Sequence, residues 1–192
     1  MPLVKRIALF ASGTGSNARK IIEYFQGDPS VEVALVVSNK ASAPVLEMAA
    51  SHGVPTLLID RHSFYQTGDL AEKLQDLQID LIVLAGFLWL VPDSLVKAFS
   101  RRIVNIHPAL LPKYGGKGMY GMHVHRAVRE AGETQSGITI HYVNERYDEG
   151  DILFQATCPV APDDDAETIA RRVLELEHEH YPRIVEKLLK SV

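Results

Sequence analysis

The sequence predicts an α/β protein with an open, mostly parallel sheet, helices on both faces of that sheet and an antiparallel C-terminal strand pair. Three observations support this fold. Short runs rich in Val, Ile and Leu alternate with helix-period segments in the first half, two longer strand-like runs flank a polar turn in the second half, and a long helical segment follows them. Because 192 residues with 46% hydrophobic content suit one packed core, we expect a single domain over residues 1–192.

The first half alternates strands and helices. Four short apolar runs are typical of parallel strands covered on both faces, namely residues 4–10, 31–37, 56–59 and 81–85. Three segments between them have apolar residues near i, i+3 and i+4, which predicts helices over residues 16–26, 43–52 and 64–78. This βαβαβα order predicts right-handed crossovers and a Rossmann-like arrangement with helices on both faces.

The second half is arranged differently. Residues 103–105 predict a brief strand, and a Pro- and Gly-rich passage over residues 108–122 follows it. Two further strands, residues 137–143 and 152–160, flank the polar turn 144–151, so we expect these two strands to pair in antiparallel directions.

The last segment predicts a long helix that begins after Asp163-Asp164-Asp165. Acidic side chains bond the free N–H groups at a helix start and favour the positive end of the helix dipole. Pro182 cannot donate a backbone hydrogen bond, and its ring collides with the preceding turn. We therefore expect the helix to kink or end near His180, with a final turn or two over residues 184–189.

Composition and charge argue against several classes of protein. A net charge of −4 and a pI near 6.1 are unlike the basic surface of a nucleic-acid binder. Cys158 is the single cysteine, so no intramolecular disulfide can form, which fits a reducing cytoplasm. The first apolar run is too short for a secretory signal, and no stretch approaches the ~20 apolar residues that span a bilayer. We expect a soluble, cytoplasmic protein with no nucleic-acid or membrane partner.

A glycine-rich loop, Ser-Gly-Thr-Gly-Ser-Asn at residues 12–17, joins the first strand to the first helix. Glycine lets the backbone turn tightly against a ligand, and the free amides of a helix start favour an anion. Ser16 and Asn17 add side-chain donors. The loop lacks the Gly-Lys-Ser/Thr ending of a Walker A motif, so it predicts a phosphate site of another kind.

Gly13-x-Gly15-x-x-Ala18 also matches the dinucleotide fingerprint, so a nucleotide-dependent oxidoreductase is an alternative. That fingerprint expects an acidic residue about twenty positions later. Residues 38–40 are Ser-Asn-Lys instead, which cannot bind a ribose diol as a carboxylate does, although a cofactor with a 2′-phosphate would tolerate them. A tight turn that binds no ligand is the third interpretation.

Asn105 and His107 lie two positions apart at a predicted strand end, so their side chains should face one space. Ligands of open α/β sheets bind at the carboxyl ends of strands. An amide and an imidazole side by side can donate to a carbonyl oxygen that gains negative charge, so we interpret the pair as catalytic. Asp148, in the turn 144–151, is a candidate for the carboxylate that would orient His107 and raise its pKa, but the sequence alone does not place it there.

Other histidines are candidates for metal ligands or site residues. His123 with His125, and His178 with His180, are spaced two apart, and such residues do not share a face of a helix, so we expect no metal. We expect His141, in the strand 137–143, to face the site or to pack within the strand.

Four motifs together resemble the phosphoribosylglycinamide formyltransferases, and the resemblance covers nearly the whole chain. They are residues 12–17, Leu84-Ala85-Gly86-Phe87, the run from Asn105-Ile106-His107-Pro108 to Leu110-Leu111-Pro112, and Asp148-Glu149-Gly150. The resemblance implies transfer of the formyl group of 10-formyltetrahydrofolate, the cosubstrate, to the amine of N1-(5-phosphoribosyl)glycinamide in de novo purine biosynthesis. A wider group that uses this folate shares the Asn-x-His-Pro pattern, and it includes hydrolases that release formate.

The resemblance also implies roles for individual residues, with residues 1–100 as a phosphate-binding half and residues 101–192 as a catalytic and folate-binding half. Catalysis is implied for Asn105, His107 and Asp148. The residues implied to bind the glycinamide substrate are Gly15, Ser16, Asn17 and Glu177. Those implied to bind folate are Arg61, Leu88, Trp89, Leu90, Val91, Asn105, Asn144, Glu145, Arg146, Tyr147 and Asp148.

Three departures from the family pattern bear on these roles. Trp89 stands where relatives often have Arg, and the helix before Asp80 is shortened, which affects the alignment of Arg61. The loop 114–121 is longer than in many members, and its four glycines indicate mobility, so it is a candidate lid.

In the mechanism that this resemblance implies, the substrate amine attacks the formyl carbon directly. Asn105 and a protonated His107 would stabilise the oxyanion, and Asp148 would favour the imidazolium. The alternatives are a formyltetrahydrofolate hydrolase, the nucleotide-dependent oxidoreductase and a non-catalytic phosphosugar-binding module. We expect a monomer or a homodimer that acts on small molecules.

Overall fold

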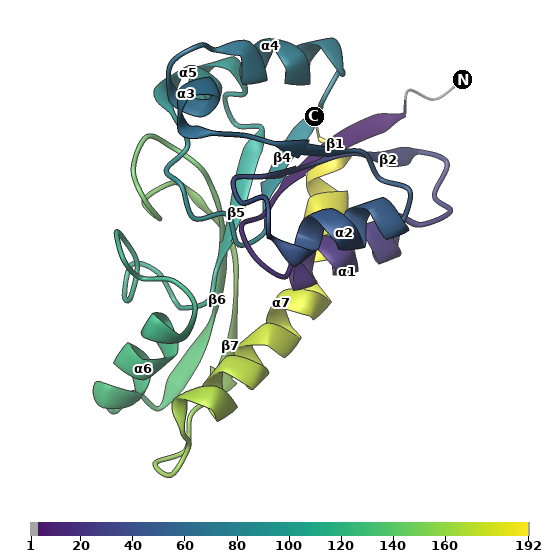
Figure 1. Ribbon diagram of the computed structural model, residues 1–192. Coiled ribbons are helices and arrows are strands. Elements are labelled where there is room, and N and C mark those ends of the chain that lie inside the picture. Colours follow the sequence, from purple (N-terminus) through teal and green to yellow (C-terminus); the bar gives the residue numbers. More distant parts are fainter. Residues whose placement is uncertain (1–3, 192) are drawn as a thin grey trace.

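A seven-stranded sheet forms the centre of the computed structural model, which describes residues 4–191 (Figure 1). The strands are β1 (Lys5–Phe10), β2 (Val31–Ser38), β3 (Thr56–Leu58), β4 (Leu81–Leu84), β5 (Ile103–His107), β6 (Gln135–Tyr142) and β7 (Ile152–Pro159). The helices are α1 (Ser16–Phe25), α2 (Pro44–Ser51), α3 (Arg61–Tyr65), α4 (Asp69–Asp76), α5 (Asp93–Ala98), α6 (Met122–Glu130) and α7 (Ala166–Leu189).

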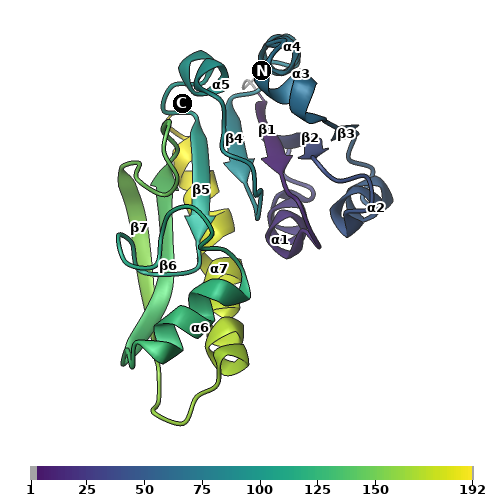
Figure 2. The same ribbon diagram turned by 60° about the vertical axis from the view of Figure 1, so that its left-hand side comes forward.

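The sheet has the strand order β3-β2-β1-β4-β5-β6-β7. The first five of these strands run parallel, whereas β6 pairs antiparallel with β5 and with β7. Figure 2 shows β1, β4 and β5 side by side, with the longer β6 and β7 beyond them. The predicted fold class, a mostly parallel open sheet with an antiparallel C-terminal pair, is confirmed.

Helices cover both faces of the sheet, as the alternation of buried residues along β1 shows. Ile7 and Leu9 pack in one apolar cluster with residues of α1, α2 and α7. Ala8 and Phe10 pack in a second cluster with residues of α3, α4 and α5. Because successive strand residues point to opposite faces, a fully buried strand needs apolar residues at every position.

The predicted helix over residues 64–78 is wrong as a single element. The structure has α3 and α4 instead, and Gly68 between them adopts a φ of 77°. A left-handed residue interrupts the helical hydrogen-bond ladder, and glycine adopts that conformation without steric cost. Asp60 caps α3 through a capping box with Ser63, which starts this helix before the predicted position.

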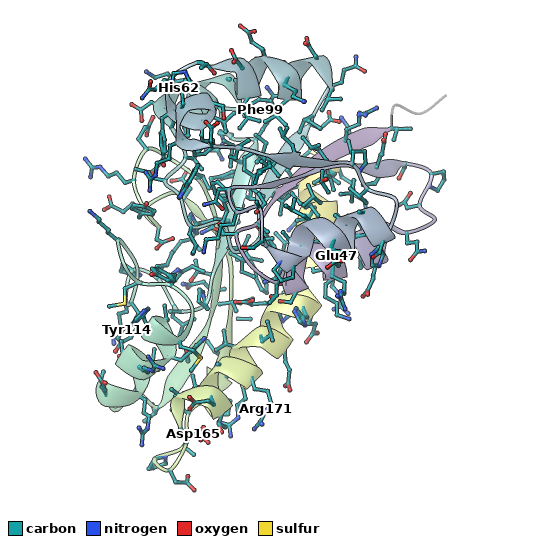
Figure 3. The ribbon with its side chains drawn as sticks, viewed as in Figure 1. Glu47, His62, Phe99, Tyr114, Asp165 and Arg171 are labelled. Carbon is teal, nitrogen blue, oxygen red and sulfur yellow. The ribbon has the colours of Figure 1, made fainter. Side chains whose placement is uncertain are left out.

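The start of the last helix agrees with the prediction, but its end does not. The Asp165 carboxylate accepts a hydrogen bond from the Thr168 amide at 2.7 Å and caps α7 (Asp165 is labelled in Figure 3). Of the predicted kink or end near His180, the end is wrong, because α7 continues past Pro182 to Leu189. Pro182 is buried, as are Tyr181 and Val185 beside it on α7, and this tertiary packing offsets the lost backbone hydrogen bond. Within residues 4–191, no helix is long and apolar enough to cross a membrane.

Tyr181 ties α7 to the sheet from a fully buried position. Its hydroxyl contacts the carbonyl oxygens of Leu84 at 2.8 Å and Val104 at 3.3 Å, one in β4 and one in β5. We expect Tyr181→Phe to lower the free energy of unfolding by about 1–3 kcal/mol, because buried acceptors lose their donor. Urea denaturation measures this, with Tyr24→Phe as the control, since Tyr24 is 44% exposed and bonds only Glu186 on the surface. Equal losses in both variants would contradict the assigned role of the Tyr181 hydroxyl.

Candidate active site

One cavity of about 910 Å³ opens at the carboxyl ends of β1, β4 and β5. After β1 the chain crosses to α1 on one face of the sheet, whereas β4 is reached from α4 on the other face. This is the topological switch point, where open α/β sheets bind ligands. The lining contains residues 12–17, Lys40, 84–91, 105–108, 116–122, His125, His141, Val143, 146–148, Ala170, Leu174 and Glu177.

The predicted phosphate loop forms one wall of the cavity. Gly15 has a φ of 71°, and a Cβ at this position would lie 2.3 Å from Cγ2 of Val45, so only glycine fits. Gly15 caps α1 without any side-chain hydrogen bond, and Ser16 and Asn17 follow it in the first helical turn. The backbone amides of this turn are open to an anion in the cavity. Lys40 lines the same cavity and adds a cation that the sequence interpretation had not assigned.

Glu177 meets the phosphate loop from α7. Its Oε2 accepts a hydrogen bond from Nδ2 of Asn17 at 2.6 Å, and Oδ1 of Asn17 has no partner among the described residues. Burial raises the pKa of Glu177 to about 7, although the bond from Asn17 opposes this rise. A buried carboxyl and an unsatisfied amide oxygen in one cavity wall are available to hydroxyl and amide groups of a ligand.

The raised pKa of Glu177 predicts a pH-dependent stability. Below pH 4.5 the carboxyl is protonated in both folded and unfolded chains, but between pH 4.5 and about 7 the folded chain binds the proton more tightly. Stability therefore falls as the pH rises through this window, by roughly 3 kcal/mol in total. Glu177→Gln removes the titration, so its stability relative to the unsubstituted protein should increase over the same window in urea denaturation. A difference between the two proteins that does not change with pH would count against a buried, protonated Glu177.

The three predicted catalytic side chains converge in the cavity. Nδ1 of His107 lies 3.5 Å from Oδ2 of Asp148, and Nδ2 of Asn105 lies 3.5 Å from Oδ1 of the same carboxylate. Asn105 and His107 both come from β5, whereas Asp148 comes from the turn between β6 and β7. The turn thus brings a remote carboxylate to the strand end, as the interpretation of Asp148 required.

His107 is buried, and its ring orientation is fixed by the backbone. Nε2 lies 2.7 Å from the carbonyl oxygen of Tyr114, which can only accept, so Nε2 carries the hydrogen (Tyr114 is labelled in Figure 3). In the neutral ring, Nδ1 is then the nitrogen without a hydrogen, and it faces Asp148. His107 can therefore accept a proton at Nδ1 beside a carboxylate.

The expectation that Asp148 keeps His107 protonated runs against the direction in which the His107 pKa is shifted. Burial lowers the pKa of His107, and the opposing effects of the Asp148 charge and the Tyr114 carbonyl do not offset it. Burial raises the pKa of Asp148, but the neighbouring His141 and His107 rings and the hydrogen bond from the Gly116 amide together bring it below its usual value. The two lowered pKa values favour a neutral imidazole beside an ionised carboxylate at neutral pH.

Asp148 is held in a demanding backbone conformation. Its φ of 56° lies in the left-handed region, which Asp and Asn tolerate better than most residues. Its Oδ2 accepts a hydrogen bond from the Gly116 amide at 2.9 Å, so the loop 114–121 is attached to the Asp148 carboxylate. This bond links the candidate lid directly to the predicted catalytic side chains.

Two further histidines line the cavity. His141 Nδ1 donates to the Tyr142 carbonyl at 2.8 Å, which leaves Nε2 as an acceptor 3.2 Å from Nδ2 of Asn105. His141 therefore orients the Asn105 amide, which confirms that it faces the site. His125 is buried, burial and His107 lower its pKa, and its Nδ1 has no partner among the described residues. The pairing of β5 with β6 explains the position of His141, since Asn105 lies opposite it.

Most of the predicted folate-binding residues lie in the same cavity, and three do not. Those in its lining are Leu88, Trp89, Leu90, Val91, Asn105, Arg146, Tyr147 and Asp148. Asn144 and Glu145 lie outside the lining. Arg61 lies beside a smaller cavity, with its guanidinium 5.0 Å from the centroid of the Trp89 ring. Trp89 therefore separates Arg61 from the main cavity.

No cluster of three or more His, Cys, Asp or Glu side chains within residues 4–191 is arranged to hold a metal ion.

The sequence profile described as formyl transferase matches residues 5–185. Phosphoribosylglycinamide formyltransferase of Haemophilus influenzae is 38% identical over 187 residues, which cover 95% of this chain and 86% of the relative. The chloroplastic phosphoribosylglycinamide formyltransferase of Arabidopsis thaliana is 45% identical over 190 residues. The match covers 96% of this chain but 65% of the Arabidopsis protein, so the chain spans less than two thirds of that relative.

Solved structures agree with the sequence matches. Glycinamide ribonucleotide transformylase 1 from Symbiobacterium toebii has a TM-score of 0.88 and 36% identity, over 98% of this chain and 89% of the other. Phosphoribosylglycinamide formyltransferase from Streptococcus pneumoniae has a TM-score of 0.84 and 38% identity, over 96% of this chain and 99% of the other. The resemblance noted from four motifs is thus supported along the whole chain.

Proposed function

The chain belongs to the formyl transferase family, and we propose that it transfers the formyl group of 10-formyltetrahydrofolate to the amine of N1-(5-phosphoribosyl)glycinamide in de novo purine biosynthesis. One observation carries this proposal. The cluster of Asn105, His107 and Asp148 shares a single cavity with an uncapped phosphate loop, so an anionic substrate and a reacting carbon can be held together. Fixing two substrates side by side contributes up to about 7–11 kcal/mol in favourable cases.

The two walls of the cavity suit the two substrates. On one side, Gly15, Ser16 and Asn17 bind the ribose phosphate. Glu177 forms a hydrogen bond with polar groups of the same substrate that lie beyond the phosphate. On the other side, residues 88–91 and the Arg146-Tyr147-Asp148 segment bind the folate. Arg61, Asn144 and Glu145 lie outside this cavity, so our proposal does not give them a contact with the folate.

The chemistry follows from the neutral state of His107. The amine attacks the formyl carbon and a C–N bond forms. The oxygen that gains negative charge accepts a hydrogen bond from the Asn105 amide, whose 3.5 Å contact with Asp148 is weak enough to exchange. Nδ1 of His107 accepts the proton that the amine loses, and the Asp148 carboxylate stabilises the imidazolium. When the bond to the folate nitrogen breaks, His107 returns the proton to that nitrogen.

The organisation of the molecule is part of the same proposal. Residues 1–192 act as one formyltransferase domain, in which residues 1–100 bind phosphate and residues 101–192 supply catalysis and share the folate contacts with residues 88–91. The continuous sheet through both halves supports a single domain. We propose a cytoplasmic monomer or homodimer that requires no metal, acts on small molecules and binds neither nucleic acid nor membranes.

A paired assay tests the proposed reaction. Loss of 10-formyltetrahydrofolate is followed spectrophotometrically with and without N1-(5-phosphoribosyl)glycinamide, and formate is measured separately. We expect folate turnover only when the glycinamide is present, with formylated product and no formate. Turnover without the glycinamide would identify a hydrolase. Saturable binding of NADPH without formyl transfer would favour an oxidoreductase, and phosphosugar binding without any turnover would indicate a binding module.

A further inference from the structure

Ser12 extends the pairing of β1 with β4 beyond the ends of both strands. The last regular bond runs from the Ala85 amide to the Phe10 carbonyl at 2.8 Å, and the next runs from the Ser12 amide to the Gly86 carbonyl at 3.0 Å. Gly86 then adopts a φ of 78° and turns the chain out of the ladder. The Leu88 amide beyond this turn donates to Oγ of Ser12 at 3.0 Å. The Ser12 hydroxyl oxygen thus accepts the hydrogen bond of the Leu88 amide, which the turn has moved away from the backbone acceptors of β1.

Asn39 sets the direction of the Ser12 hydroxyl. The hydroxyl has one hydrogen, which it donates to Oδ1 of Asn39 at 2.6 Å, so its lone pairs remain for the Leu88 amide. Asn39 follows β2 and does not line the main cavity. Ser12 is 3% exposed, so its three hydrogen bonds lie in a poorly solvated place where unmade bonds are costly. The bonds join the chain after β1, β2 and β4 at a single residue.

The segment that Ser12 holds is the wall formed by residues 88–91. Tyr65 supports the other part of this wall, since its hydroxyl donates to the Leu90 carbonyl at 2.9 Å. The wall therefore has two side-chain attachments, one from Ser12 and one from Tyr65, and loss of one should loosen the wall without unfolding it. Trp89, the single tryptophan of the chain, lies between these attachments and reports on the wall directly.

We propose that Ser12 is a positioning residue for the folate, which acts by holding residues 88–91 in the shape that receives this substrate. The inference rests on the proposed function for the identity of the ligand. Ser12 is the first residue of the phosphate loop, but in this proposal it helps to bind the folate and not the phosphate-bearing substrate. Ser12 acts through the Leu88 amide and not on the reacting atoms.

The first test compares Ser12→Ala with Ser12→Thr in the formyl-transfer assay. Loss of the hydroxyl should raise KM for 10-formyltetrahydrofolate by roughly 3- to 10-fold, the effect of one net hydrogen bond, while KM for the glycinamide substrate and kcat change by less than about twofold. Thr keeps the hydroxyl and should retain more of the folate affinity than Ala. An unchanged folate KM, or an equal rise in both KM values, would overturn the proposal.

Asn39→Ala separates positioning from direct contact, because Asn39 lies outside the main cavity. Asn39→Ala should raise KM for the folate, as Ser12→Ala does. The double variant should have a folate KM no higher than that of Ser12→Ala alone, since both changes interrupt the same series of hydrogen bonds from Asn39 through Ser12 to Leu88. Additive losses would show that Ser12 touches the substrate itself, which contradicts the proposal. This variant also provides the test if Ser12→Ala does not fold.

Fluorescence anisotropy of Trp89 gives a readout that needs no substrate. In ligand-free Ser12→Ala, the anisotropy should fall, because residues 88–91 lose their hydrogen bond to Ser12 and the Trp89 ring moves more freely. In Ser12→Thr the anisotropy should stay near the value of the unsubstituted protein. Anisotropy that is equal in all three proteins would overturn the proposal. If the paired assay finds no formyl transfer, the proposed function fails, whereas this measurement still decides whether Ser12 holds the wall.

Discussion

Replacing His107 with alanine is expected to lower kcat by about 100- to 10,000-fold, the range that a positioned general base contributes. In the proposed mechanism the imidazole moves the proton between the two substrate nitrogens, and its Nδ1 is free of hydrogen in the neutral ring. Binding of both substrates should change little, because the phosphate loop and the wall formed by residues 88–91 are separate from the ring. Single-turnover kinetics at saturating substrate measures the chemical step, and equilibrium titration measures binding.

His123→Ala is the matched control for this experiment. His123 lies in α6, is exposed and does not line the cavity, so its removal should leave kcat near the unsubstituted value. A His107→Ala protein that keeps normal turnover would remove the proposed proton transfer entirely. A variant with normal kcat and weak binding would instead show that His107 holds a substrate.

Local patterns predicted the sheet and the shared direction of the strand-end side chains well. The Val-, Ile- and Leu-rich runs became β1, β2 and β4, because a strand buried on both faces must be apolar at each position. Asn105 and His107 share one space because strand geometry fixes the two-residue period. Gly15 could be read as a phosphate-loop residue for a similar reason, since its backbone conformation depends on the absence of a Cβ.

Features that depend on tertiary contacts could not be predicted from local sequence patterns. The run over residues 64–78 has a helical period, yet Gly68 divides it. Pro182 predicts a helix end, yet burial of its neighbours on the sheet keeps α7 intact. The family resemblance alone implied a folate contact for Arg61, and the ring of Trp89 lies between that side chain and the cavity.

The protonation state of His107 could not be predicted from residue types either. The sequence offered an opposite charge, which by itself raises a histidine pKa, but it gave no measure of burial. In the structure the two effects compete at one ring, and burial dominates. The resulting neutral imidazole changes its proposed role from a charged donor to a base.

Asp148→Asn is expected to lower kcat by on the order of 100-fold or more while the fold is retained, because it removes the charge that stabilises the imidazolium. Asparagine tolerates the φ of 56°, and its side-chain oxygen can still accept the hydrogen bond from Gly116. Thermal denaturation should therefore show a much smaller change than the kinetics. Asp151→Asn is the control, since Asp151 lies in the same turn, is exposed and pairs only with Arg101 at the surface.

The pH profile of Asp148→Asn tests the assigned charges. The Asp148 charge raises the pKa of His107 against the larger effect of burial, so its removal should lower that pKa further. Because the proposed mechanism uses the neutral ring, kcat/KM should fall on the acid side as His107 becomes protonated, below its usual pKa of 6.5. In Asp148→Asn this acid limb should move to lower pH, while the maximum rate stays depressed. A limb that moves to higher pH, or that vanishes in the unsubstituted protein, would refute the assignment of His107 as the base.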